Sequence, residues 1–309
     1  MAYIDVSSVS KAFAAGRAVR CVLEDVTLSV ERGEFVSIVG FMGCGKSTLL
    51  SIIAGLMPPD AGEVRLGGEL VRGVRPKTAI VFQNYSLLPW LAALENVHLA
   101  VAAALPMWPR ERQATQARWY LDKVGLASAA GRRPQQLSGG MRQRVAIARA
   151  LATEPDVLFL DDPFGALDAL TRANLQQELA QLCSAEARPV TTIMITNSVE
   201  EALLLSDRIV PMTHGPRATL GRAVAVAIPK PRTLAQLVHD EDAMHSRARV
   251  VESLTASVRR PRRLQCTPQP VEDMTRNWLP RWTRRTRRSN PDKNGIVPQS
   301  PPCPPWWSA

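Results

Sequence analysis

Short runs of apolar and β-branched residues alternate with stretches of helical periodicity along most of the chain. The runs at 35–39, 157–160 and 190–195 are continuous, which is typical of parallel strands buried on both faces. The stretch 93–183 is mainly helical in character. Four prolines interrupt it, at Pro106, Pro109, Pro134 and Pro155. Buried strands that alternate with helices predict an α/β fold, with phosphate chemistry at the carboxyl ends of the strands.

The two ends of the chain depart from this pattern. Residues 3–30 alternate apolar and polar positions around a turn at 14–17, which predicts short strands on either side of that turn. Residues 241–258 predict a closing helix. From residue 259 onward no helical or strand period continues, and 10 of the 51 residues are proline. We therefore expect a disordered tail at 259–309.

A glycine-rich loop follows the first buried run. It reads Gly40-Phe41-Met42-Gly43-Cys44-Gly45-Lys46-Ser47-Thr48, fits the pattern G-x-x-x-x-G-K-[ST], and opens into a helix-like segment at 48–54. Its glycines let backbone N–H groups close on a polyphosphate, and the helix N-terminus adds partial positive charge. Lys46 can reach the β and γ phosphates, and the Ser47 hydroxyl can bind Mg²⁺. Because Cys44 lies inside this loop, alkylation of its thiol is expected to obstruct the phosphates.

Composition excludes several classes of protein. The hydrophobic content of 46% is ordinary for a globular chain of 309 residues, and no apolar run is long enough to span a membrane. The start of the chain lacks the basic and apolar regions of a secretory signal. The five cysteines are scattered without metal or disulfide spacing, which suits a reducing cytosol.

The net charge of +10 belongs mainly to the tail, because residues 259–293 carry +8 and the rest of the chain +2. We therefore expect no specific nucleic-acid partner for the folded part. The tail interleaves Arg with Trp278, Trp282, Trp306 and Trp307 and could bind RNA or an anionic membrane. An unselected extension without a partner is the alternative, and the missing periodicity favours it.

A second glycine-rich turn reads Leu137-Ser138-Gly139-Gly140-Met141-Arg142-Gln143-Arg144 and precedes a helix with one apolar face. Ser138 at the N-cap and the free N–H groups of the two glycines make another anion site. Since the Lys46 loop already holds the γ phosphate from one side, this second site suggests a clamp on a nucleotide bound by another subunit. A plain capped helix is the alternative.

Taken together, these segments resemble the ATPase subunits of ABC transporters over about residues 3–240. The resemblance rests on the phosphate loop, Gln83 in Val-Phe-Gln-Asn-Tyr-Ser-Leu-Leu-Pro-Trp, the Leu-Ser-Gly-Gly turn, the apolar run ending in Asp161, and Ala166-Leu167-Asp168. It implies a P-loop ATPase cassette at 1–240 with a RecA-like core, an antiparallel β region and a helical signature subdomain at about 93–155. It also implies a head-to-tail dimer that sandwiches two ATP molecules.

The resemblance further implies roles for single residues. Phe13 falls where the family has an aromatic ring that stacks on adenine, although a core Phe fits equally well. Gln83 would touch Mg²⁺ or the attacking water, and Asp161 would hold Mg²⁺ together with Ser47. Asp168 would contact the partner's site. The remaining residues expected to bind ATP are Gly40, Gly43, Cys44, Gly45, Lys46 and Thr48 of the phosphate loop, and Ser138, Gly139 and Gly140 of the second turn.

At two positions this chain differs from the family, and both residues are ones that the resemblance assigns to ATP hydrolysis. The family has Glu after the Mg²⁺-binding Asp, whereas this chain has Asp162, whose carboxylate is retracted by about 1–1.5 Å. Such a displacement can cost on the order of 100-fold in rate. The family has His after the next strand, where this chain has Asn197, whose amide donates a hydrogen bond but is no imidazole. We therefore expect intact ATP binding and weakened hydrolysis.

Within the family, the segments around Gln83, Asp168 and Ser206 look most like the bacterial nitrate, nitrite and cyanate importers, whose relatives import sulfonates and taurine. The resemblance implies a second ATPase subunit, integral permease subunits and, indirectly, a periplasmic binding protein. It places the chain at the cytoplasmic face of the inner membrane.

Three hypotheses remain open from the sequence. The chain is a transport ATPase, a low-turnover ATP-binding member of an asymmetric ATPase pair, or a soluble ABC protein of DNA repair or translation. The third class usually has two cassettes or a long coiled-coil insertion, and this single cassette has neither.

Overall fold

The computed structural model of the protein describes residues 2–15, 18–183 and 190–258. The predicted tail at 259–309 lies outside the described residues. The strands are β1 (Ile4–Ala15), β2 (Ala18–Val30), β3 (Phe35–Val39), β4 (Ala61–Leu66), β5 (Glu69–Leu70), β6 (Thr78–Val81), β7 (Val157–Asp161), β8 (Thr191–Thr196), β9 (Arg208–Pro211) and β10 (Val224–Ala225). The helices are α1 (Lys46–Ile53), α2 (Ala93–Ala104), α3 (Arg110–Lys123), α4 (Gly139–Leu151), α5 (Ala169–Cys183), α6 (Val199–Leu205), α7 (Leu234–His239) and α8 (Glu241–Val258), with 3-10 turns at Ala127–Ala129 and Pro134–Gln136.

The central sheet has six strands in the order β10-β9-β3-β8-β7-β6. All neighbours in it pair in parallel except the edge strand β10, which is antiparallel to β9. The parallel α/β sheet expected from the continuous apolar runs is therefore confirmed. Because Val39 of β3 pairs with Thr196 of β8, and Ile195 pairs with Asp161 of β7, the carboxyl ends of these three strands are level.

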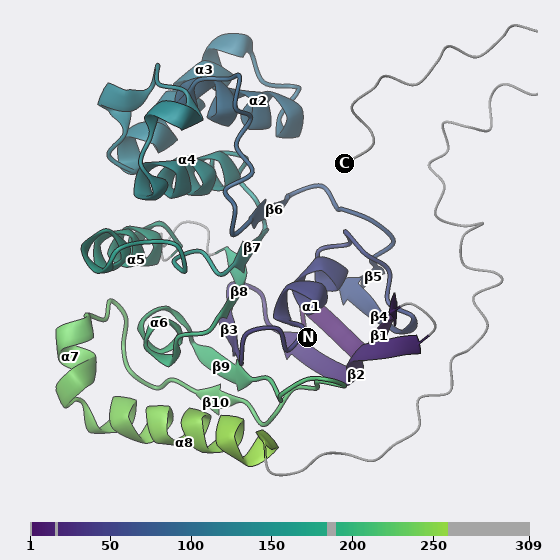
Figure 1. Ribbon diagram of the computed structural model, residues 1–309. Helices are drawn as coiled ribbons and strands as arrows, with labels where there is room; N and C mark the ends of the chain where they lie inside the picture. Colours follow the sequence, from purple (N-terminus) through teal and green to yellow (C-terminus); the bar gives the residue numbers. More distant parts are fainter. Residues whose placement is uncertain (1, 16–17, 184–189, 259–309) are drawn as a thin grey trace, which may run out of the picture. The chain divides into compact units, whose positions relative to one another are not determined.

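Period-two alternation divides the buried side chains of the sheet between two cores. On β7, Leu158 and Leu160 face a core with α4, α5 and α6, while Val157 and Phe159 face a core with α1 and the β1–β2 strands. In Figure 1, α5 and α6 accordingly lie on one side of the central sheet, and α1 with the antiparallel strands lies on the other. Burial on both faces explains why these strands are mainly apolar, with only small hydroxyl side chains such as Ser37 and Thr192 among their buried residues.

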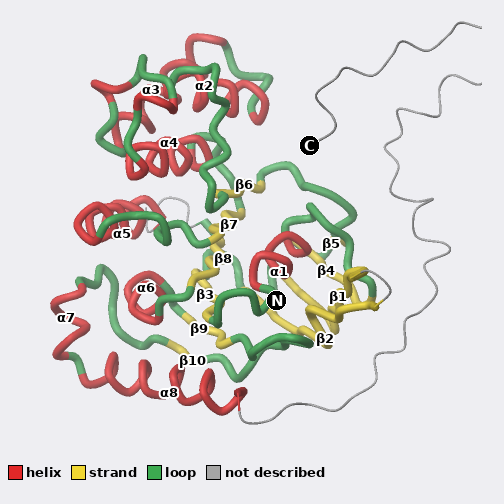
Figure 2. Tube along the Cα trace, in the orientation of Figure 1, coloured by secondary structure: helices red, strands yellow, loops and turns green. Residues whose placement is uncertain are grey.

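The N-terminal strands form a separate antiparallel sheet in the order β2-β1-β4-β5. The strands are longer than the short ones predicted around a turn at 14–17, because Ala14 and Ala15 still pair with Val19 and Ala18, and Phe13 pairs with Arg20. Figure 2 shows this sheet beside α1. Phe13 therefore lies on the same side of the central sheet as the phosphate-loop helix.

Helices α2, α3 and α4 enclose a third core of their own, which includes Val97, Leu121 and Val145. These helices follow one another in Figures 1 and 2 as a cluster at one end of the central sheet. Among the helices that the structure describes, none combines the length and the apolar character needed to cross a membrane.

Candidate nucleotide site

The phosphate loop lies between β3 and α1, as the strand–loop–helix pattern predicts. Gly43 and Gly45 have φ values of 75° and 111°, in the left-handed region that favours glycine. A Cβ on Gly45 would also lie 2.9 Å from Cγ1 of Val22. Both the backbone conformation and the close approach of β2 therefore require glycine at this position. Lys46 begins the helix immediately after it.

The Lys46 ammonium is buried in this loop, with 7% of the residue exposed. Its Nζ donates to Gly40 O at 2.8 Å, to Phe41 O at 2.9 Å and to Asn197 Oδ1 at 2.8 Å. Burial lowers the pKa of Lys46, and the nearby Cys44, Asp162 and Asp161 oppose that shift. Because an ammonium has three N–H donors, the loop and Asn197 together use its full capacity.

Ser47 and Asp161, the two residues expected to bind Mg²⁺, contact each other. Ser47 Oγ donates to Asp161 Oδ1 at 3.0 Å, which joins α1 to the end of β7. This distance is close to the spacing of about 2.9 Å between neighbouring oxygens around Mg²⁺, whose bonds are about 2.0–2.1 Å long. The hydroxyl and the carboxylate are hard oxygen donors, so the residues present fit this ion. Burial raises the pKa of Asp161, while Ser47 and Lys46 oppose the shift.

Asp162 lies where the two amide side chains of the site meet. Its Oδ2 is 3.4 Å from Gln83 Nε2 and 3.5 Å from Asn197 Nδ2. The residue has φ 43°, and a Cβ on Gly165 would come within 2.4 Å of Asp162 Oδ2. Gly165 therefore leaves the space that the Asp162 carboxylate occupies. Burial is the largest influence on the pKa of Asp162 and raises it. Lys46 and Arg172 lower this pKa, whereas Asp161 raises it further.

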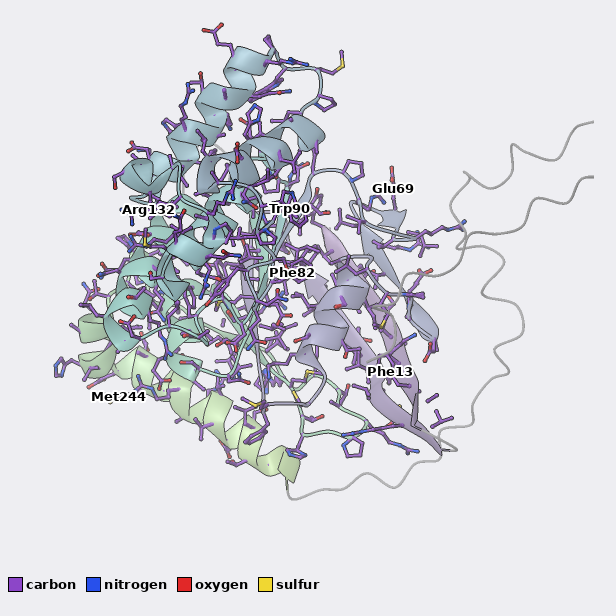
Figure 3. All side chains as sticks on the ribbon, turned by 45° about the horizontal axis from the view of Figure 1, so that its top comes forward. Phe13, Glu69, Phe82, Trp90, Arg132 and Met244 are labelled. Carbon is purple, nitrogen blue, oxygen red and sulfur yellow. The ribbon has the colours of Figure 1, made fainter. Side chains whose placement is uncertain are left out.

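An open cleft of about 600 Å³ contains most of the predicted residues. Phe13, which Figure 3 labels on β1, is 38% exposed and is among the residues that line the cleft. This exposure favours a ring available to a base over a core Phe. The predicted residues that line the cleft are Phe13, Gly43, Cys44, Gly45, Lys46, Ser47, Thr48, Gln83, Asp161, Asp162 and Asn197. Gly40 lies behind the loop and contributes its carbonyl oxygen to Lys46.

The residues of the second glycine-rich turn, 137–144, do not line this cleft. Ser138 caps α4 by accepting from Met141 N at 3.2 Å, and a Cβ on Gly140 would lie 2.3 Å from Thr171 Cγ2 of α5. Asp168, which is also outside the cleft, accepts from Thr171 N at 3.0 Å. Hydrogen bonds from the backbone and side chain of Thr171 lower the pKa of Asp168. Asp168 and the turn are therefore joined through Thr171 at the start of α5, and neither lines the cleft.

The cleft wall also contains residues that were not predicted to belong to the site, among them Arg20, Met42, Gly215 and Pro216. The turn predicted at 14–17 would have put Ala18 opposite Phe13, so it did not indicate Arg20, which lies opposite Phe13 because Ala15 pairs with Ala18. Gly215 packs on the phosphate loop, where its Cβ would lie 3.6 Å from Cys44 Cα. No local signal connects segments so far apart in sequence.

The fold and the cleft together define a P-loop nucleotide-binding protein. Residues 23–165 match the family model described as ABC transporter. The nitrate import ATP-binding protein NrtD of Synechococcus elongatus is 48% identical over 238 residues, which cover 77% of this chain and 86% of NrtD. The chain belongs to the ABC transporter family, among its ATP-binding proteins.

Two further proteins are similar to this chain. The bicarbonate transport ATP-binding protein CmpC of Synechococcus elongatus is 46% identical over 258 residues, which cover 83% of this chain but only 39% of CmpC. The chain thus spans about two fifths of the length of CmpC. The solved dimeric ATP-binding cassette MJ0796, bound to ADP and Pi, superposes with a TM-score of 0.66 and 33% identity, covering 73% of this chain and all of that one. The predicted cassette fold and the resemblance to nitrate importers are confirmed, and bicarbonate transport proteins join the group.

Proposed function

We propose that this chain is the ATP-binding and ATP-hydrolysing subunit of an importer for small oxoanions, acting as a head-to-tail dimer on permease subunits at the cytoplasmic face of the membrane. One observation carries the proposal. The level ends of β3, β7 and β8 bring Lys46, Asp161, Asp162 and Asn197 into one cleft, with Phe13 on its wall. This arrangement offers a cation for phosphates, oxygens for Mg²⁺ and a ring for adenine.

The chain's own residues divide the work along a bound nucleotide. The phosphate loop and Lys46 bind the phosphates, and Phe13 stacks on the base. Ser47 and Asp161 would hold Mg²⁺, which supplies charge neutralisation between the phosphates when bound. Asp162 and Gln83 orient the attacking water, and Asn197 donates to the γ phosphate. We also propose a division of the chain into a cassette at 1–240, with its helical subdomain at 93–155, and a closing helix at 241–258.

The second subunit completes each site in this proposal. Ser138, Gly139 and Gly140 do not line the cleft of their own chain, which leaves them available to a nucleotide bound by a partner. Asp168 lies beside them at the start of α5. The dimeric state of MJ0796 supports this arrangement, since that cassette shares one third of its sequence with this chain over most of the described region.

The proposed substrate class rests on the relatives. Proteins named for nitrate import and for bicarbonate transport are similar to this chain at 44–50% identity. Both anions are small, planar and singly charged. We propose an importer for an anion of this kind, assisted by a periplasmic binding protein.

A second candidate function concerns the pairing of subunits. Synechococcus elongatus has two proteins named nitrate import ATP-binding protein, NrtC and NrtD, and both are similar to this chain. Asp162 and Asn197 stand where the family has Glu and His. These observations favour an asymmetric pair in which this chain binds ATP and turns it over slowly.

Nucleotide binding tests the proposal directly. Calorimetry should detect Mg-ATP binding by the wild type, and Lys46→Ala should weaken it at least about tenfold, because the phosphates lose a charge-assisted contact. Lys123→Ala is the matched control, since Lys123 is a cation of α3 that packs over Trp119, 5.0 Å from its ring centre. Equal affinity of the wild type and Lys46→Ala would refute the site.

The transport role needs a cellular measurement. A chromosomal Lys46→Ala substitution should abolish uptake of labelled nitrate or labelled bicarbonate by the source cells. Unchanged uptake of both anions, together with normal ATP binding by the wild-type chain, would reject the substrate class but leave the ATPase assignment standing.

A further inference from the structure

A buried carboxylate lies directly behind the Asn197 turn. Glu201 of α6 is only 4% exposed and lies three residues after the N-cap Ser198. This spacing predicts a capping box, in which Glu201 would accept from the Ser198 N–H. Instead Ser198 N donates to Thr196 Oγ1 at 3.1 Å, and Thr196 Oγ1 donates to Glu201 Oε2. Glu201 thus turns inward and holds the Thr196–Ser198 turn that carries Asn197.

The second oxygen of the same carboxylate faces α5. Gln176 Nε2 donates to Glu201 Oε1 at 3.3 Å, and Gln176 is 2% exposed. Arg172 Nε lies 4.0 Å from Glu201 Oε1 and has no hydrogen-bond partner among the described residues. One carboxylate therefore joins the turn after β8 to two side chains of α5.

Arg172 extends this connection to the start of α5. Its Nη2 donates to Leu167 O at 3.0 Å, and its backbone N donates to Asp168 O at 2.9 Å. Thr171 of the same helical turn packs on Gly140, where a Cβ would be 2.3 Å from Thr171 Cγ2. The first turn of α5 therefore contacts both Asp168 and the glycine-rich turn at the start of α4.

We propose that Glu201 is a positioning residue that joins the Asn197 turn of a subunit's own nucleotide site to the residues that face its partner's site, Asp168 and Ser138–Gly140. The inference rests on the head-to-tail dimer of the proposed function. Occupation of one cleft moves or orders the Asn197 turn, and Glu201 passes that change through Gln176 and Arg172 to the first turn of α5. The two ATP sites are then coupled through the interior of each subunit.

The cost of burying this carboxylate supports a role beyond packing. Burial raises the pKa of Glu201, and Asp162 raises it further, whereas Thr196, Arg172 and Gln176 oppose the shift. A buried carboxylate is stabilised only by such partners, and an apolar residue of similar size would avoid the desolvation. Its partners here belong to the two elements that carry Asn197 and Asp168.

Steady-state ATP hydrolysis by the purified protein tests the coupling. Glu201→Ala should lower the Hill coefficient for ATP toward 1 and kcat by about tenfold, with nucleotide affinity changed less than about threefold. Glu201→Gln keeps an acceptor for Thr196 but loses the attraction to Arg172. Glu201→Gln should therefore recover most of the kcat that Glu201→Ala loses, but it should keep the low Hill coefficient of Glu201→Ala.

Glu200→Ala is the matched control, because Glu200 is the adjacent carboxylate of α6 and accepts from Ser198 Oγ of the same turn at 3.3 Å, whereas its other partner is Arg247 of α8, at 3.5 Å, rather than α5. It should retain the wild-type Hill coefficient. The proposal is overturned if the wild type shows a Hill coefficient of 1, if Glu201→Ala keeps the wild-type value, or if Glu200→Ala loses it equally. Failure of the wild type to bind ATP at all would instead reject the proposed function.

Amide hydrogen exchange tests the same connection without requiring ATP turnover. A non-hydrolysable ATP analogue with Mg²⁺, added to the dilute monomer, should slow amide exchange at 166–172 as well as in the phosphate loop. In Glu201→Ala only the phosphate loop should be slowed. Equal slowing at 166–172 in both proteins would overturn the connection.

Discussion

Lys46 Nζ donates to Asn197 Oδ1 at 2.8 Å, so the phosphate-loop lysine and the residue after β8 are bonded across the cleft, 151 positions apart in sequence. The Asn197 amide also lies 3.5 Å from Asp162 through its Nδ2. A single amide therefore connects the cation proposed to bind phosphates to the carboxylate proposed to orient water. Entry of a nucleotide must replace at least one bond of Lys46.

Removal of the Asn197 amide should strengthen the binding of a nucleotide that lacks the γ phosphate. Asn197→Ala frees one N–H of Lys46, so ADP, which lacks the phosphate that Asn197 would contact, should bind about two- to tenfold more tightly. Asn197→Asp should have the opposite effect, because a carboxylate holds Lys46 more strongly than an amide does. Calorimetry with ADP measures both. Weaker ADP binding by Asn197→Ala would show that the contact with Lys46 does not compete.

Restoring the two family residues should accelerate hydrolysis. Asp162→Glu together with Asn197→His should raise kcat by about ten- to a thousand-fold with little change in ATP affinity, since both groups act mainly on the transition state. The effects should be non-additive, because Asp162 and Asn197 address the same phosphate and water and lie 3.5 Å apart. A wild-type rate of about 1 s⁻¹ or more would contradict the idea of a weakened site.

Cys44 should react slowly although it lies within the phosphate loop. Only 2% of the residue is exposed, and burial raises the pKa of its thiol even though Lys46 opposes the shift. Alkylation depends on the thiolate, so the folded protein should be labelled at least about tenfold more slowly than the protein in urea. Mass spectrometry of iodoacetamide-treated protein measures this, with Cys44→Ser as the control. Any adduct that does form at Cys44 should prevent ATP binding.

The pH dependence of stability should reveal the buried Glu201. Its pKa is raised in the folded chain by burial, so the folded protein holds this proton more tightly than the unfolded chain does. The contribution of Glu201 to the free energy of unfolding is therefore fully present below the ordinary Glu pKa of about 4.3. It is lost as pH rises through the raised pKa. A pKa that differs by one pH unit between the folded and unfolded chains changes the free energy of unfolding by about 1.4 kcal/mol.

Urea denaturation of the wild type and Glu201→Gln at pH 4.5 and 7.5 measures this effect, because the glutamine does not titrate. The free energy of unfolding of the wild type should fall relative to that of Glu201→Gln as pH rises. A constant difference would show that Arg172 and Thr196 balance the burial of Glu201, and a difference that grows in favour of the wild type would show that they outweigh it.

Local chemistry along the chain was sufficient to predict the phosphate loop and the central strands. The loop needs a strand before it, glycines at set spacing and a helix after it, and all of these are neighbours in sequence. The runs 157–160 and 190–195 predicted strands buried on both faces, and β7 and β8 are such strands. The sequence also placed Asp161 at the carboxyl end of the apolar run 157–160, and β7 ends at Asp161.

Tertiary structure decided which of these groups meet. The order of the sheet places β3 between β8 and β9, and this order brings Asn197 to Lys46 and Gly215 to the phosphate loop. Glu201 shows the limit of local rules most clearly, because its spacing from Ser198 predicts a cap, yet its carboxylate turns inward to Thr196 and Gln176. Hydrophobic period and loop geometry are encoded by residues close in sequence. The partner of a buried polar group is chosen only when the sheet and its covering helices have excluded water from around it.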